Sequence, residues 1–189
     1  MPKSVLFDRD KIIQKVTDLF WQKGYKGTSM QDLVDITGLN RSSFYNSFGD
    51  KFQLFEESIR SYQKIQNEIF GRAFAKEESP KQGIISLFED IRDEIRTNET
   101  NHGCFITNST AEFGNTDDRI YDFLRENMKS AVSLFEMLII KAQEAGEIDS
   151  SKDARELGLY LFSSLQGLQV TSMIEPNVEG VTKEILASL

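Results

Sequence analysis

Residues 28–51 read TSMQDLVDITGLNRSSFYNSFGDK and predict two short helices, a tight turn between them and the start of a third helix. Thr28 and Gln31 have the spacing of a capping box, so the first helix is expected to begin directly after Thr28. Gly38 stands where a left-handed residue ends a helix, and Asn40 is a strong N-cap for the next one. Two short helices joined by so short a turn predict a helix-turn-helix.

The second helix of this pair has an apolar side and a polar side. Phe44 and Phe48 are expected to point inward, which leaves groups that can read DNA on the outside. Arg41 can pair with a guanine edge, and Asn46 can pair with adenine or touch the backbone. Further DNA contacts are expected from hydroxyls suited to phosphate oxygens and from one lysine at a helix start, namely Thr28, Ser42, Ser43, Tyr45, Ser47 and Lys51. The alternative is a helical hairpin with an ordinary solvated face.

Residues 38–51, GLNRSSFYNSFGDK, resemble the recognition segment of TetR-type (TetR/AcrR) bacterial transcriptional regulators. The resemblance is specific from about Asp8 to Phe55 and architectural beyond it. It implies that Thr28, Tyr45 and Lys51 hold phosphates and that Arg41, Ser42 and Asn46 face bases. The chain departs from the family at Phe44, where leucine is usual.

Composition limits the classes of protein that remain. With 39% hydrophobic and 28% charged residues, the 189-residue chain reads as globular. It has neither an apolar run long enough for a membrane span nor an apolar signal core, so a cytoplasmic protein without a membrane partner is expected. One cysteine and one histidine exclude an internal disulfide framework and leave too few ligands for a zinc site of that kind. No metal and no cofactor are expected.

Charge is divided unevenly along the chain. Residues 1–51 hold eight Lys/Arg and six Asp/Glu, a formal charge of +2, whereas residues 52–189 hold 14 and 24, a formal charge of −10. An acidic body repels phosphate and leaves the N-terminal head to meet DNA. The same acidity also favours solubility, and both effects can hold.

Helical periodicity continues to the C-terminus, and the chain is expected to be all-α with about nine helices. A helix-turn-helix head of three helices is placed in residues 1–51. A helical body for effector binding and dimerisation is placed in residues 52–189, with a linking helix from about residue 50. The expected helices outside residues 28–51 begin at about Asp8 or Asp10, Asp50, Pro80, Cys104, Thr116, Ala154 and Val178, and Gly24 and Gly146 end two of them.

A single helix-turn-helix reads too few base pairs, so a two-fold homodimer on a palindromic operator is expected. The last two helices have apolar surface for a partner as well as for the core. The residues assigned to this interface are Gly158, Leu161, Phe162, Leu165, Gln169, Val178, Val181 and Ile185. The alternative is that both faces serve the core of one chain.

The body has more aromatic residues than helix packing alone requires, which is compatible with an apolar effector pocket. The residues assigned to the pocket are Phe70, Phe74, Phe88, Cys104, Phe105, Asn108, Tyr121, Phe162 and Gln166. For any one of them the competing interpretation is ordinary core packing. In the TetR-like family an effector commonly moves the linking helix, so the resemblance implies a repressor released by a small apolar or aromatic molecule.

Three alternative functions are compatible with parts of the sequence. Cys104 follows His102 at the start of a short helix, where a thiolate is favoured, so a redox- or electrophile-sensing regulator is possible; a lone cysteine between apolar residues is also an ordinary buried side chain. An enzyme lacks its usual signals here, since the sequence has no nucleophile triad and no phosphate loop. A helical adaptor would use the head to bind protein.

Overall fold

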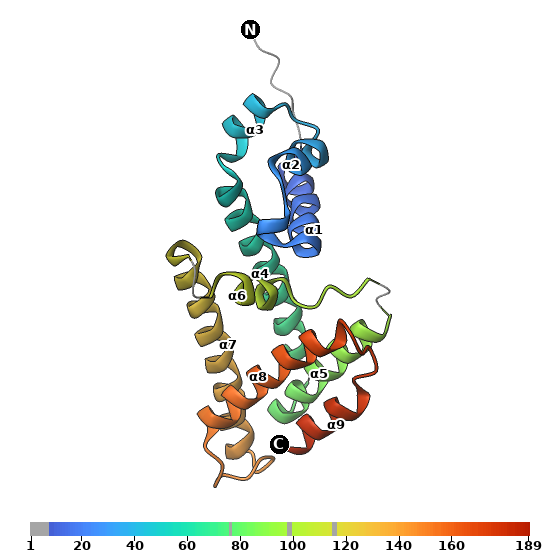
Figure 1. Ribbon diagram of the computed structural model, residues 1–189. Coiled ribbons are helices and arrows are strands. Elements are labelled where there is room, and N and C mark those ends of the chain that lie inside the picture. Colours follow the sequence, from blue (N-terminus) through green and yellow to red (C-terminus); the bar gives the residue numbers. More distant parts are fainter. Residues whose placement is uncertain (1–7, 76, 98–99, 115–116) are drawn as a thin grey trace. The chain divides into compact units, whose positions relative to one another are not determined.

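The computed structural model describes residues 8–75, 77–97, 100–114 and 117–189. These residues form nine helices and no strand (Figure 1). The helices are α1 (Arg9–Gly27), α2 (Met30–Thr37), α3 (Arg41–Phe48), α4 (Lys51–Ala75), α5 (Pro80–Thr97), α6 (Phe105–Phe113), α7 (Asp118–Glu144), α8 (Ala154–Ser172) and α9 (Glu179–Ala187). The all-α prediction with about nine helices is confirmed. None of the described helices is long and apolar enough to cross a membrane.

The chain divides into two compact units, Met1–Ile65 and Gln66–Leu189. We call the first the head and the second the body. The division falls inside α4 rather than at its start, where the sequence placed it, because the first turns of α4 pack into the head. Phe55 is fully buried there, with its ring perpendicular to the Phe20 ring and the two ring centres 5.3 Å apart.

Local capping explains where the helices of the head begin and end. Asp8 caps α1, and Gly24 interrupts its helical geometry at φ 72°, but the chain resumes helical geometry to Gly27, beyond the expected stop. Ser29, not Thr28, caps α2, and it does so reciprocally with Asp32 instead of Gln31. The predicted capping box was therefore one residue too early, because the hydroxyl of Thr28 donates to the Gly24 carbonyl at 2.7 Å.

The start of α4 shows why a glycine precedes it. Asp50 and Gln53 each accept a hydrogen bond from the other's backbone N–H, at 2.8 and 2.9 Å, which closes a reciprocal cap. Gly49 has φ 71°, and a Cβ built on it would lie 1.7 Å from the Gln53 side-chain oxygen. Any side chain at Gly49 would displace the cap of α4.

Asp32 gives the head a pH-dependent contribution to stability. A hydrogen bond from Lys23, followed by those from Ser29, holds the pKa of Asp32 well below its ordinary 3.8. Because the folded pKa is the lower one, the carboxylate stabilises the head above about pH 4 and loses this effect as pH falls toward the depressed pKa. Asp32→Asn should therefore lower the free energy of unfolding at neutral pH.

Urea unfolding at a series of pH values, followed by the fluorescence of Trp21, the one tryptophan of the chain, measures this effect. The difference in the free energy of unfolding between wild type and Asp32→Asn should become smaller as the solution is acidified below about pH 4. Asp35→Asn, which removes an exposed carboxylate from the same helix, is the control. If the difference in unfolding free energy between wild type and Asp32→Asn stays constant across the acid range, the Asp32 carboxylate does not make this pH-dependent contribution.

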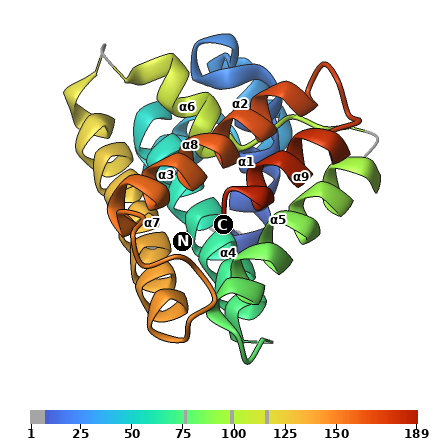
Figure 2. The ribbon, with the colours of Figure 1, turned by 90° about the horizontal axis from the view of Figure 1, so that it is seen from below.

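The body is built around α8, which packs against both α7 and α9, and Figure 2 shows it between them. Fully buried side chains from α5, α7 and α8 form the centre of this core, including Leu87, Phe88, Ile139 and Leu161. A Cβ on Gly158 would lie 3.1 Å from the Glu136 backbone nitrogen and 3.2 Å from the Val132 carbonyl. This glycine thus allows α8 to approach the backbone of α7 closely.

The other predicted helix starts are close to the structure. Pro80 begins α5, Cys104 is the N-cap of α6, and α8 begins at Ala154 as expected. The expected cap Thr116 lies outside the described residues, and Asp117 caps α7 by accepting from the Arg119 N–H at 3.0 Å. The last helix begins one residue later than expected, at Glu179.

Candidate nucleic-acid interface

The turn between α2 and α3 sets the direction of the polar helix. Gly38 is left-handed at φ 67°, and its N–H donates to the Val34 carbonyl at 3.0 Å. Asn40 caps α3 by accepting from the Ser43 N–H at 2.9 Å. Phe44 and Phe48 are buried, at 0% and 4% exposure. Two anchors and a side-chain cap therefore hold a helix of only eight residues.

The opposite face of α3 is open to solvent. Arg41, Ser42, Tyr45 and Asn46 are exposed, as the sequence predicted, while Ser43 and Ser47 are half-buried. Arg41 has no hydrogen-bond or ion-pair partner among the described residues. A guanidinium, an amide and two hydroxyls thus share one helix face, which is the chemistry that reads base edges and phosphates.

Thr28 and Lys51, both expected to contact phosphates, differ from the exposed residues of α3 in their surroundings. Thr28 is 1% exposed and its hydroxyl is used within the chain, so its side chain does not fit a phosphate-binding role. Lys51 is half-buried at the first residue of α4, with its ammonium 4.2 Å from the centre of the Tyr25 ring. The ammonium is thus held against an aromatic ring by a cation–π contact, on a residue that begins a helix, where an anion is favoured.

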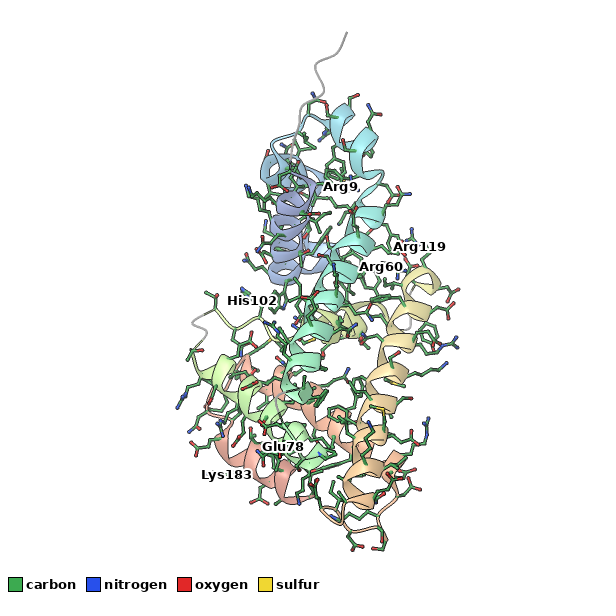
Figure 3. The ribbon with its side chains drawn as sticks, turned by 180° about the vertical axis from the view of Figure 1, so that it is seen from behind. Arg9, Arg60, Glu78, His102, Arg119 and Lys183 are labelled. Carbon is green, nitrogen blue, oxygen red and sulfur yellow. The ribbon has the colours of Figure 1, made fainter. Side chains whose placement is uncertain are left out.

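The sequence reasoning missed Arg9, which connects three helices of the head (labelled in Figure 3). Its guanidinium donates to both carboxylate oxygens of Glu57 on α4, at 2.9 and 2.6 Å, and to the Ser47 carbonyl in the last turn of α3, at 2.7 Å. It also lies 4.5 Å from the centre of the Phe48 ring. Arg9 therefore positions the C-terminal end of α3. The only signal in the sequence was an arginine in the first turn of α1.

We expect Arg9→Ala to loosen α3 without removing any residue of its exposed face. The lost hydrogen bonds should lower the free energy of unfolding of the head by about 1–2 kcal/mol, a value kept small because the ion pair is partly exposed. Operator binding should weaken as well, because α3 is held less firmly. Arg9→Lys should rescue little, since an ammonium lacks the planar fork. Urea unfolding followed by Trp21 fluorescence measures the effect.

Lys11→Ala is the matched control for Arg9, because among the described residues Lys11 pairs with Asp8, the N-cap of its own helix, at 3.2 Å. An Arg9→Ala protein that is as stable as the Lys11→Ala protein would show that the contacts of Arg9 do not support α3.

The residues assigned to an effector pocket are only partly brought together. Tyr121, Phe162 and Gln166 line one pocket of about 180 Å³ between α6, α7 and α8, together with residues that were not assigned to it, such as Ile106, Leu124 and Met128. The remaining assigned residues lie outside its lining.

Packing explains why those residues are elsewhere. Phe88 and Phe105 are core side chains, at 0% and 2% exposure, and Phe70 and Phe74 pack against the body core. Asn108 donates to the His102 carbonyl at 2.8 Å, and Cys104 is the half-buried N-cap of α6. The core interpretation was thus the right one for the phenylalanines of α4 and α5 and for Phe105.

Most residues assigned to a dimer interface are buried within the chain itself. These are Gly158, Leu161, Phe162, Leu165, Val178 and Ile185. The two apolar stripes of α8 look alike in sequence, and one of them forms the contact with α7. Gln169 is half-buried and Val181 is exposed. The side of α8 that the body leaves uncovered carries Leu159, Tyr160, Gly167 and Val170 instead.

A capped, doubly anchored α3 with an exposed reading face defines a DNA-binding protein of the helix-turn-helix class. Residues 12–58 match the model of the family described as bacterial regulatory proteins, tetR family. Residues 80–183 match the model described as tetracyclin repressor-like, C-terminal domain. The chain belongs to the TetR family of bacterial transcriptional regulators.

Relatives agree with this assignment along the whole chain. The uncharacterized HTH-type regulator YezE of Bacillus subtilis is 25% identical, covering 100% of this chain and 98% of that protein. The HTH-type transcriptional repressor ComR of Escherichia coli is 27% identical, covering 88% of this chain and 80% of ComR. A cysteine-substituted form of the TetR-family regulator CifR, solved with 26-bp operator DNA, has the same fold, with a TM-score of 0.86, 22% identity and coverage of 100% and 99%.

Proposed function

We propose that this TetR-family regulator is a repressor that binds a two-fold symmetric operator as a homodimer and is released by a small effector. The single observation that carries the proposal is the exposed face of α3, with Arg41, Ser42, Tyr45 and Asn46 on a helix held by two buried anchors. ComR, a repressor by name, and CifR, solved on operator DNA, support it. No catalytic role is proposed.

The residues of the head are given separate roles in this proposal. Arg41, Ser42 and Asn46 face base edges, whereas Tyr45, Ser43, Ser47 and Lys51 contact phosphates. A dimer presents two α3 helices to successive major grooves about 34–36 Å apart. The second copy packs on the uncovered side of α8, where Gly167 permits close approach.

Release requires a link between the body and the head. Helix α4 begins in the head and ends in the body. Arg9 joins α4 to α3, because it donates to Glu57 and to the Ser47 carbonyl. A shift of α4 that starts at its C-terminal end is therefore passed to α3. An effector can release DNA only if it binds the form that does not fit the operator more tightly. The protein acts in the cytoplasm, where the operator is.

The test is footprinting of the purified protein on the DNA upstream of its own gene, at several salt concentrations. A protected near-palindrome, with affinity that falls steeply as salt rises, is the expected result. Sedimentation of the complex should give two chains per operator. Protection that is absent, or independent of DNA sequence, would contradict the proposal and favour the adaptor alternative.

A second candidate is thiol sensing through Cys104, a half-buried free cysteine that caps a helix N-terminus. Adding an alkylating reagent to the footprinting reaction distinguishes the two candidates. Loss of protection in the wild type, but not in Cys104→Ser, would make the thiol the sensor.

A further inference from the structure

The pocket between α6, α7 and α8 has an apolar wall and an uncharged polar wall. Ile106, Leu124 and Met128 provide aliphatic surface, and Phe162 adds an aromatic ring. Two side-chain amides, Asn127 and Gln166, also line it. An apolar cavity with a few convergent polar groups is the usual form of a small-molecule site.

The two amides are available to a ligand. Both are half-buried, and neither has a hydrogen-bond partner among the described residues. An amide offers two donors and one acceptor oxygen, so the pair suits a carbonyl or a hydroxyl group equally well. The pocket thus selects a molecule with one polar end.

The one charge in the lining is already balanced. Arg125 pairs with Asp122 at 3.1 Å and with Glu126 at 3.8 Å, and its guanidinium lies 5.8 Å from the centre of the Tyr121 ring. A ligand carboxylate near Arg125 would also lie near these two carboxylates, and their repulsion offsets much of the attraction of the guanidinium. An uncharged ligand has no such penalty.

Size sets the second limit. The pocket holds about 180 Å³, whereas sites for drug-sized ligands measure roughly 300 Å³ or more. An apolar protein cavity of about 150 Å³ accepts one benzene molecule. One ring with a short substituent is therefore the size that fits.

We propose that this pocket is the effector site and that it binds an uncharged monocyclic aromatic compound bearing one carbonyl or hydroxyl group. The ring lies on Ile106, Leu124 and Met128, and the oxygen faces Asn127 and Gln166. The effector role of this ligand rests on the proposed repressor function, whereas binding of the ligand to the pocket does not.

Calorimetric titration of the full chain, without DNA, tests binding directly. Acetophenone is the probe, and benzoate, of similar size but charged, is its matched control. Acetophenone should bind and benzoate should bind at least tenfold more weakly. Asn127→Leu and Gln166→Leu should each weaken acetophenone binding roughly 2- to 12-fold, the effect of one neutral hydrogen bond.

Met128→Trp should fill the pocket and abolish binding. Met137→Trp is its control, because Met137 is on the same helix with a similar exposure, 43% against 41%, and nine residues further on, which places it on the opposite face. Circular dichroism melts confirm that both variants fold. Equal binding by the two variants, or tighter binding of benzoate than of acetophenone, overturns the proposal.

Footprinting with added acetophenone separates the site from its role. Release of operator DNA from the wild type but not from Met128→Trp supports an effector site. Binding in the calorimeter without any effect on the footprint overturns the effector role. If the protein does not protect the operator even without acetophenone, the repressor proposal fails. The calorimetric measurement of acetophenone binding is not affected by that outcome.

Discussion

Arg41→Ala is expected to remove sequence-specific DNA binding. Arg41 is exposed at the first residue of α3 and has no partner among the described residues. A bidentate arginine–guanine pair contributes about 1–3 kcal/mol of discrimination, and a dimer contains two of them. The affinity for the operator should fall between roughly 30-fold and 10⁴-fold, while binding to unrelated DNA changes little. Fluorescence anisotropy with operator and scrambled DNA measures both affinities.

Two further variants separate charge from recognition. Arg41→Lys keeps the charge but loses the planar fork, so it should retain non-specific affinity and still lose specificity. Arg60→Ala removes one exposed cation from α4 in the same unit and should leave the specificity ratio unchanged. An equal loss of specificity in Arg41→Ala and Arg60→Ala would mean that Arg41 contributes only its charge.

Phe44→Ala is expected to abolish DNA binding without changing any residue of the exposed face of α3. Phe44 is completely buried, and replacing such a ring by alanine costs about 3–5 kcal/mol, a large part of the stability of an ordinary domain. A helix of two turns does not persist in water unless it is packed. The face that carries Arg41 therefore loses its position.

The single tryptophan makes this measurement possible. Trp21 packs edge-on against Tyr62, with ring centres 5.2 Å apart, so its fluorescence reports on the head. Phe44→Leu is the matched control, since leucine keeps much of the apolar volume and should cost far less than alanine. A Phe44→Ala protein with wild-type unfolding and no DNA binding would refute the packing explanation.

Much of the head was predictable from the sequence because its helix ends are decided by near neighbours. Gly38, Asn40 and Asp50 act through residues no more than four positions away. The error at Thr28 has the same local origin, because two adjacent hydroxyl residues can each cap a helix. The choice of Ser29 depends on Asp32, which Lys23 holds at 2.7 Å.

The exposed face of α3 was also predictable, since helical periodicity places Arg41 and Tyr45 opposite Phe44 and Phe48. Arg9 was not predictable in the same way. Its partners, Ser47 and Glu57, are 38 and 48 positions away. A pattern of neighbouring residues contains no information about so distant a contact.

The sequence by itself determined the class of fold, the helix-turn-helix and the exposed face of α3, because periodicity and capping act within a few residues. Only the tertiary structure decided how the body uses its apolar surface. Gly158 and Leu161 face the chain's own core, while Tyr121, Phe162 and Gln166 meet around a pocket. An apolar stripe can be buried equally well against the same chain, a second chain or a ligand. Which of these occurs depends on the packing of whole helices.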